Sequence, residues 1–195
     1  MPPLLGDGHF NVATTGGVHA VDPASGEHRW TVDAPLAAGM YPEFAIYDSL
    51  LIAPGGTEPG GIPDGLVGID LADRSVRWEN TYGLSFGTPR VAVGKDAMYD
   101  VRLERVVELD PATGDYLEDT VVSLPDDQFI LGYALNDSVL YATSGLTVYA
   151  LDLSAGSVRW QRRVQDLPDP IGPGTRHLEH VVAGHALVAA DDVAD

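Results

Sequence analysis

The sequence predicts an all-β fold made of repeated four-stranded antiparallel units. One eleven-residue sequence motif, called the phrase below, occurs twice in full, as Ala20, Asp22, Gly26 and Trp30 and as Ala150, Asp152, Gly156 and Trp160. Two degenerate copies lie between them: Gly68, Asp70, Arg74 and Trp78, and then Glu108, Asp110, Gly114 and Glu118. The four aspartates are 48, 40 and 42 residues apart, and a period near 40 residues marks a repeat architecture. No stretch of about ten residues has convincing helical periodicity.

The local pattern around each copy indicates four strands, here lettered A to D. Apolar–polar alternation, which is typical of a strand, precedes each turn at 18–22, 66–70, 105–109 and 147–151. These runs are the C strands, and the tryptophan strand D follows the turn, as at 157–161. β-rich runs such as 49–53 and 138–142 supply strand B, and the runs at 43–47, 89–93 and 130–134 supply strand A.

Four antiparallel strands in about 40 residues form a blade of a β-propeller. A blade buries both faces only by stacking on neighbours, so we expect one domain of cooperating units. The expected units are 10–33, 43–80, 89–122 and 129–164, with a partial unit at 177–195. The first unit is expected to contain only strand B, at 10–14, before its C strand, which places both ends out of phase with the blades. About four blades are therefore expected, in an incomplete ring or open arc, with a closed four-bladed ring as the alternative.

Composition excludes several classes of function. The formal net charge is −18, from 29 acidic residues against 11 Lys and Arg, with Lys95 the only lysine. Such a chain repels nucleic acid and anionic membranes. The even spread of acids favours a solvated surface suited to high salt over an acidic ligand face. With no cysteine, disulfides, thiolate metal sites and cysteine nucleophiles are excluded. No apolar run approaches the ~20 residues that cross a bilayer, so direct membrane insertion is not expected.

Each position of the phrase has a structural explanation. The aspartate can hold a tight turn by accepting backbone N–H bonds, and glycine can adopt the turn's left-handed conformation. The small residue at the first position of the phrase, as in Ala20, Gly68 and Ala150, leaves room for close packing. Trp30, Trp78 and Trp160 are expected to be buried between blades, with their N–H groups bonded to carbonyls, and ligand stacking is the alternative. On this basis Trp160→Ala should cost about 3–5 kcal/mol.

These residues resemble the tryptophan-docking repeat of the pyrroloquinoline-quinone (PQQ)-like β-propellers, and the resemblance covers nearly the whole chain. That superfamily includes quinoprotein dehydrogenases as well as non-enzymatic members, such as the outer-membrane assembly lipoprotein of the β-barrel machinery and extracytoplasmic repeat proteins. Its full propellers have seven or eight blades, which favours reading this chain as part of a ring. The resemblance implies an extracytoplasmic protein. Residues 1–7 lack a signal-peptide pattern, so this location requires that a signal is missing before Met1. Otherwise the protein is expected in the cytoplasm.

The catalytic and metal-binding options have little support in the sequence. The quinoprotein dehydrogenases pair adjacent cysteines beside the quinone and use Ca²⁺ with a catalytic aspartate, whereas this chain has no cysteine and no calcium-loop cluster. His177, Glu179, His180 and His185 gather near the end, but on a strand they do not converge on one metal. A nucleophile elbow is absent. We therefore expect no catalytic residue, no metal and neither PQQ nor Ca²⁺.

Loops are the expected place for binding. In a propeller the B–C and D–A connections share one face, and the long connections 54–65, 82–86 and 166–176 fall there. The candidate binding residues on these loops are Pro54, Glu58, Asp64, Tyr82, Phe86, Asp166 and Arg176. The alternative is that these Pro- and Gly-rich loops are linkers. The favoured function is a non-catalytic binding or assembly scaffold that meets a protein partner or self-associates through open blade edges. A degenerate or partial quinoprotein dehydrogenase, and a sensor or interaction domain of a larger protein, are the alternatives.

Overall fold

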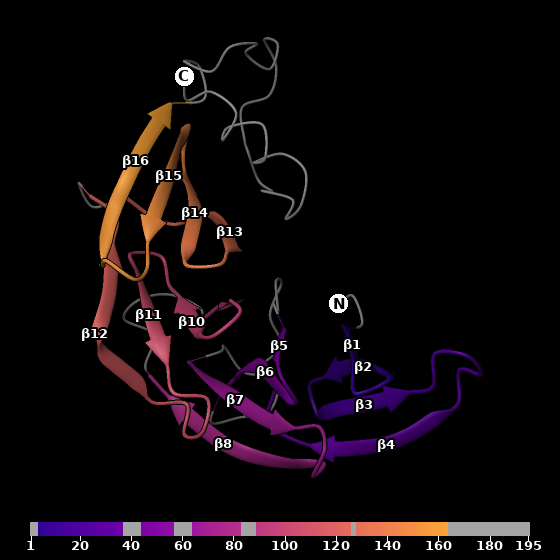
Figure 1. Cartoon of the computed structure of the whole chain (residues 1–195). Coiled ribbons are helices and arrows are strands. Elements are labelled where there is room, and N and C mark those ends of the chain that lie inside the picture. The colour runs from indigo at the N-terminus through magenta and orange to yellow at the C-terminus, as the bar shows by residue number, and fades with distance from the viewer. Residues whose placement is uncertain (1–3, 37–43, 57–63, 83–88, 126–127, 164–195) are drawn as a thin grey trace. The chain divides into compact units, whose positions relative to one another are not determined.

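The fold consists of four-stranded antiparallel sheets. A computed structural model describes residues 4–36, 44–56, 64–82, 89–125 and 128–163, and within these ranges it contains sixteen β-strands and no helix. The strands form four sheets of four, and neighbours in each sheet follow one another in the sequence (Figure 1). The all-β class and the four-stranded blade expected from the sequence are confirmed.

The first two sheets come from the N-terminal half of the chain. The first contains β1 (Leu4–Gly6), β2 (His9–Thr14), β3 (Gly17–Val21) and β4 (His28–Asp33). The second contains β5 (Ala45–Tyr47), β6 (Leu50–Gly55), β7 (Gly65–Asp70) and β8 (Ser75–Thr81). The expectation that only strand B precedes the first C strand was wrong, because Leu4–Gly6 forms an A strand paired with β2. The first blade is therefore complete.

The other two sheets repeat the same order of strands. The third contains β9 (Val91–Val93), β10 (Met98–Val101), β11 (Arg105–Leu109) and β12 (Tyr116–Ser123). The fourth contains β13 (Gly132–Asn136), β14 (Val139–Ser144), β15 (Thr147–Asp152) and β16 (Ser157–Arg163). The partial unit expected at 177–195 lies outside the described residues.

Two compact units divide the chain. One holds the first two sheets, β9, β10 and parts of β11 and β12, and the other holds the fourth sheet with the rest of the third. The contacts described below, apart from those within the fourth sheet, lie inside the first unit.

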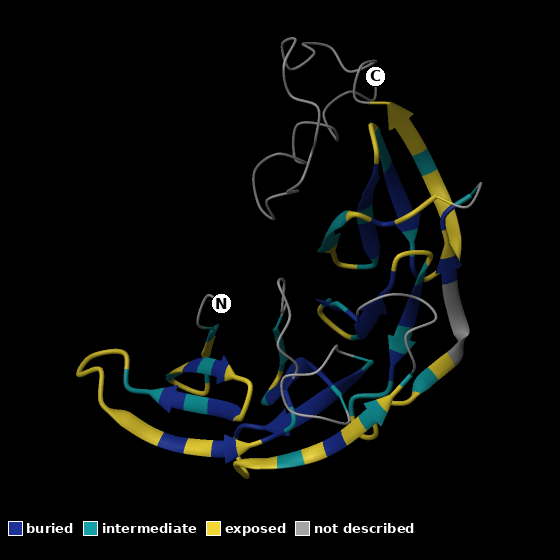
Figure 2. Ribbon diagram, turned by 180° about the vertical axis from the view of Figure 1, so that it is seen from behind, coloured by how far each residue is buried: buried dark blue, intermediate teal, exposed yellow. Residues whose placement is uncertain are grey.

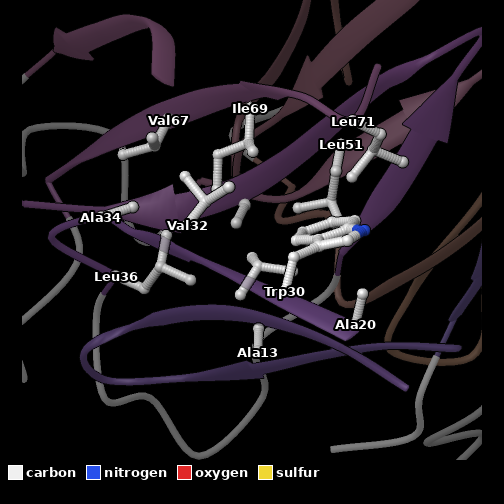
Figure 3. Packing of buried hydrophobic residues seen from close by; sticks show 12 residues of the cluster. Ala13, Ala20, Trp30, Val32, Ala34, Leu36, Leu51, Val67, Ile69 and Leu71 are labelled. Atoms are coloured by element: carbon white, nitrogen blue, oxygen red, sulfur yellow. The ribbon is translucent and has the colours of Figure 1, made fainter. Parts of the chain in front are cut away.

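The core is formed by sheet faces of opposite kinds. We call the face that carries the phrase tryptophan the tryptophan face, and the opposite face the leading face. In one core, Ala20 and Trp30 on the tryptophan face of the first sheet pack with Leu51 and Ile69 on the leading face of the second. Figure 3 shows the Trp30 ring beside Leu51 and Leu71. Because side chains alternate across a strand, each sheet can present both faces to neighbours.

A second core repeats this arrangement. Ile52 and Trp78 on the tryptophan face of the second sheet pack with Met98 and Leu109 of the third sheet. Trp78 is only 7% exposed, and Ile52 and Met98 are fully buried. Burying such side chains contributes roughly 1.5–3 kcal/mol each, so these junctions supply much of the hydrophobic stabilisation of the first unit.

Candidate functional site

The repeated phrase forms one geometry at each turn. The Oδ1 atom of Asp22 accepts the backbone N–H groups of Ala24 and Ser25, both at 2.9 Å. Oδ1 of Asp70 does the same for Ala72 and Asp73, also at 2.9 Å. Because each carboxylate satisfies donors that the turn leaves unpaired, the aspartate holds the chain reversal that brings strand D back onto strand C.

Glycine occupies the closing position of three of these turns, and an arginine occupies it in the second copy. Gly26, Gly114 and Gly156 have φ values of 74°, 75° and 62°, in the left-handed region where an L side chain is strained. Arg74 occupies the equivalent position of the second copy with a φ of 55°. The turn therefore keeps its conformation after losing glycine, and Arg74 carries the strain.

An arginine that the sequence analysis missed completes the constellation. The register shifts between Ala20 and Val21, and the bulge leaves Arg29 as the extra residue of β4. Equivalent bulges place Arg77 and Arg159 just before their tryptophans. Each of these side chains returns to the turn aspartate of its own sheet. Arg29 Nη2 lies 2.7 Å from Asp22 Oδ2, Arg159 Nε lies 2.8 Å from Asp152 Oδ2, and Arg77 Nη2 contacts Asp70 Oδ2.

The ion pairs and the turn N–H groups stabilise the charged form of each aspartate. The Arg29 guanidinium, followed by the backbone N–H groups of Ser25 and Ala24, holds the pKa of the Asp22 carboxyl far below its usual range. The pKa of Asp70 is lowered first by the backbone N–H of Asp73 and then by Arg77. The pKa of Asp152 is lowered in the same way. All three carboxyl groups are thus ionised and occupied at neutral pH, in a structural role.

Trp78 docks on the turn of the next repeat. Its indole N–H donates to the carbonyl of Pro111 at 3.1 Å. The ring covers Gly114 so closely that a Cβ on Gly114 would lie 2.5 Å from Trp78 Cε3. On its own sheet, a Cβ on Gly68 would lie 2.3 Å from Trp78 Cε2. The two glycines therefore make space for the ring on both sides. Asn80 adds a hydrogen bond from its side-chain amide to the carbonyl of Thr113 at 2.9 Å.

The other two tryptophans differ from Trp78. Trp30 is 7% exposed, and its indole nitrogen has no hydrogen-bond partner in the part of the chain that the structure describes. Trp160 is only partly buried and lies 6.0 Å from Tyr141, ring to ring. Figure 2 shows that β4 alternates between buried and exposed residues and that β8 has a buried residue near its middle, whereas β16 is exposed along most of its length. Burial between sheets thus describes Trp30 and Trp78, and it does not describe Trp160.

A buried polar cluster lies beside the Trp78 junction. Arg102 Nε donates to Asp100 Oδ2 at 2.6 Å, and both side chains are essentially inaccessible to solvent. The Tyr116 hydroxyl donates to the same carboxylate oxygen at 2.6 Å. The ring of Tyr82 stacks on Tyr116 with centroids 4.3 Å apart, and the Arg102 guanidinium lies 5.6 Å from the Tyr82 centroid. A buried pair of this kind tolerates the loss of one partner poorly, because the other charge is left uncompensated.

The protonation states of this cluster suit a structural network. Burial raises the pKa of Asp100, against the opposing influence of Arg102 and Tyr116. Burial also raises the pKa of Tyr82, and burial together with the Asp100 charge raises that of Tyr116. Both phenols therefore stay protonated at neutral pH and act as hydrogen-bond donors.

The structure describes three of the seven candidate loop residues. Pro54 belongs to β6, where it is buried and pairs with Leu66, so the B–C connection is shorter than expected. Asp64 precedes β7 and accepts the backbone N–H of Tyr82 at 2.9 Å. The hydroxyl of Tyr82 donates to the carbonyl of Gly114. The bases of the B–C and D–A connections of the second sheet therefore adjoin. The remaining four, Glu58, Phe86, Asp166 and Arg176, lie outside the described residues.

The described residues offer little for cofactor or metal chemistry. In these ranges no group of three or more His, Asp or Glu side chains could hold a metal ion. The histidines at 177, 180 and 185 lie outside them. Nor do the described residues include a helix with the length and hydropathy needed to cross a bilayer. The aspartates of the phrase that could offer oxygen ligands are occupied by turn N–H groups and, in three copies, by arginines.

Comparisons with known structures agree with this geometry. BamB from Moraxella catarrhalis matches with a TM-score of 0.56 and 15% identity, over 83% of this chain and 47% of that chain. The Pan2 WD40 domain from Neurospora crassa matches with a TM-score of 0.58 and 13% identity, over 83% and 51%. The computationally designed Ika8 protein matches with a TM-score of 0.56 and 12% identity, over 80% and 46%. A search of curated proteins found no match.

The four-stranded antiparallel sheets and the matched structures place this chain in the class of β-propeller proteins. A family model described as outer membrane protein assembly factor BamB matches residues 14–170. The chain therefore belongs to this family of PQQ-repeat propellers, as the resemblance of the phrase predicted. It spans about half the length of the solved structures it matches, consistent with an incomplete propeller.

Proposed function

We propose that this protein is a non-catalytic binding or assembly scaffold. The observation that carries the proposal is the use of the repeated polar residues. The phrase aspartates accept turn N–H groups, three of them hold arginines, and Trp78 docks on the next turn. A chain whose recurrent polar residues hold its turns, and whose Trp78 joins two blades, provides rigid surface for partners. The family match, described by an assembly factor, supports the same proposal.

The binding surface we propose is the side that carries the B–C and D–A connections of the second sheet. The hydrogen bond between Tyr82 N–H and Asp64 O brings the bases of these two connections together. The buried Asp100–Arg102 pair, stacked under Tyr82, gives them a fixed base. Loops on a rigid scaffold are the usual place for recognition. The partner is a protein or another copy of the chain, because a net charge of −18 disfavours nucleic acid and anionic lipid.

We further propose an extracytoplasmic location and adaptation to high salt, as the family resemblance and the aspartate-rich composition suggest. The competing class is a degenerate or partial quinoprotein dehydrogenase, and a sensor or interaction domain within a larger protein is the third option. The sequence of the complete gene separates the third option, because a kinase motif set would indicate signalling. An upstream signal peptide with a lipidated cysteine would indicate a surface lipoprotein.

A quinone titration separates the scaffold from the dehydrogenase. PQQ and Ca²⁺ are added to the chain and the quinone absorbance is followed, with a quinoprotein dehydrogenase as the positive control. We expect no saturable change with the chain at micromolar quinone. Stoichiometric binding at micromolar concentration or tighter would overturn the scaffold proposal.

A further inference from the structure

The leading face of the first sheet has the construction of a buried face, yet it is exposed. Leu5, Phe10 and Val21 are cross-strand partners on this face. Their equivalents in the second sheet, such as Leu51 and Ile69, are almost fully buried under the tryptophan face of the first sheet. Leu5 is 65% exposed and Phe10 37% exposed. Within the described residues, no sheet covers this apolar row.

The tryptophan face of the fourth sheet has the complementary property. Trp160 pairs with Ala150, which pairs with Tyr141, in the register that Trp30 and Ala20 have in the first sheet. Trp30 is buried, whereas Trp160 and Tyr141 are only partly buried. No hydrogen bond from the Trp160 indole N–H to any described residue is observed. This face therefore has the tryptophan of a junction without the turn on which a tryptophan docks.

The missing turn has a matching copy at the start of the chain. The turn that receives Trp78 runs from Asp110 to Gly114, and the one from Asp22 to Gly26 has the same Asp-Pro-Ala-hydroxyl-Gly sequence. Its hydrogen bonds also agree: the glycine N–H donates to the aspartate carbonyl at 2.7 Å in the docked turn and at 2.9 Å in the first turn. The glycine φ values are 75° and 74°. A Cβ on Gly26 would meet no described atom within 4 Å, so the position that Trp78 occupies over Gly114 is open over Gly26.

In chain order, a phrase tryptophan can dock on the turn of the copy that follows it. Trp78 docks on a carbonyl 33 residues further along the chain. Trp160 belongs to the last copy of the phrase in this sequence, and the turn at 22–26 belongs to the first. Within the described residues, Trp160 is thus an undocked tryptophan and the turn at 22–26 is a vacant turn of the matching kind.

We propose that two copies of this chain associate through these two faces. The tryptophan face of the fourth sheet of one copy packs on the leading face of the first sheet of the other. There Trp160 covers Gly26, and its N–H donates to the carbonyl of Pro23, the counterpart of Pro111. Each copy carries both faces, and the dimer we propose is the symmetric one, in which two such contacts form. This inference rests on the scaffold proposal and deepens it by naming a second copy as a partner.

Charge and size support a second copy as the occupant. β16 carries Arg162 and Arg163 beside Arg159, which is already paired with Asp152, and the turn at 22–26 lies in a chain of net charge −18. Arg162 occupies the position of Asn80, whose amide bonds to the carbonyl of the docked turn. Two copies together contain twice the four sheets of one chain, and the solved propellers are about twice this chain in length.

The mass of the chain in solution tests the dimer. Light scattering after size exclusion should give twice the 20.7 kDa of the chain at micromolar concentration in molar KCl. High salt is chosen because it screens the repulsion between two acidic copies. Trp160→Ala should raise the dimer dissociation constant at least tenfold, and so should Gly26→Asn, which keeps the left-handed turn accessible but places a side chain under the ring. Leu146→Ala, an exposed apolar residue at the β14–β15 turn, is the matched control and should leave the mass unchanged.

Mixing the two variants tests the pairing of Trp160 with the Gly26 turn. Each variant alone has no intact contact, whereas a mixed pair has one, between Trp160 of the Gly26→Asn copy and the turn of the Trp160→Ala copy. The mixture should therefore contain more dimer than either variant alone. A wild-type mass of 20.7 kDa at all concentrations would overturn the proposal, as would a mixture with no gain. Either failure leaves the quinone titration unaffected, so the scaffold proposal is judged separately.

Discussion

At the scale of single residues, equivalent positions of the phrase do different work. Trp78 is buried with its N–H bonded, Trp30 is buried without a described partner, and Trp160 is partly exposed. Gly114 lies under Trp78 and makes room for it, whereas the second copy has Arg74 at the glycine position.

Tryptophan truncations should therefore have unequal costs. Trp78→Ala should lower the free energy of unfolding by about 3–5 kcal/mol, the usual cost of removing a large buried ring. Trp160→Ala should cost clearly less in the monomer, because its ring is partly solvated. Urea unfolding at low protein concentration measures both. Equal costs for the two variants would show that exposure does not separate these positions.

The phrase aspartates make the free energy of unfolding depend on pH in the acid range. Because the pKa values of Asp22, Asp70 and Asp152 are lowered by folding, their contribution is present above the unfolded pKa near 4 and is lost as pH falls through the lower folded pKa. The free energy of unfolding should therefore fall below about pH 4. In Asp22→Asn, which keeps a turn acceptor but loses the charge, the fall between pH 5 and pH 3 should be smaller. An identical pH profile for wild type and variant would contradict this origin.

At the scale of elements, the alternation pattern predicted the C strands closely, although all six residues of β7 are buried. The expected 105–109 coincides with β11, and 66–70 differs from β7 by one residue. The sequence did not reveal β1, whose three residues are too short for a periodic pattern. The arginine–aspartate pairs were also missed, although Arg-Trp occurs at 29–30, 77–78 and 159–160. Their pairing depends on a bulge, which a count of alternating residues does not show.

The turn of the second, degenerate copy of the phrase provides a test of backbone strain. Arg74 adopts a φ of 55° at a position where the other copies have glycine. Arg74→Gly should raise the free energy of unfolding by up to about 1 kcal/mol, because glycine removes the left-handed penalty while losing more chain entropy on folding. Asp73→Gly, one residue earlier and without a positive φ, is the control and should not stabilise. Destabilisation by Arg74→Gly would indicate that the arginine side chain contributes more than its backbone costs.

At the scale of the whole molecule, repetition predicted both the fold and its family. Each blade has two faces, and the first two cores show that stacking on a neighbouring blade buries them. The candidate loop site was less predictable. The buried Asp100–Arg102 pair, from β10 and the residue after it, lies under Tyr82 of a D–A connection, and this cluster has no sequence pattern of its own.

The charge of the whole chain predicts its response to salt. The acidic side chains that give the net charge of −18 repel one another at low ionic strength. Salt screens this repulsion, since the Debye length falls to about 3 Å at 1 M salt. The melting temperature should therefore rise between low and molar KCl, as followed by circular dichroism. A flat melting temperature over this range would contradict adaptation to high salt.

The central claim is that the tryptophan of one repeat docks on the turn of the next, and a double-mutant cycle tests it most directly. Measured on the monomer at low protein concentration, Gly114→Ala should cost about 1–3 kcal/mol more than Gly26→Ala, because both glycines have positive φ but only Gly114 lies against a tryptophan of the same chain. In a Trp78→Ala background that excess should largely disappear. If Gly114→Ala costs the same with and without Trp78, the ring does not dock on this turn and the account of the repeat is wrong.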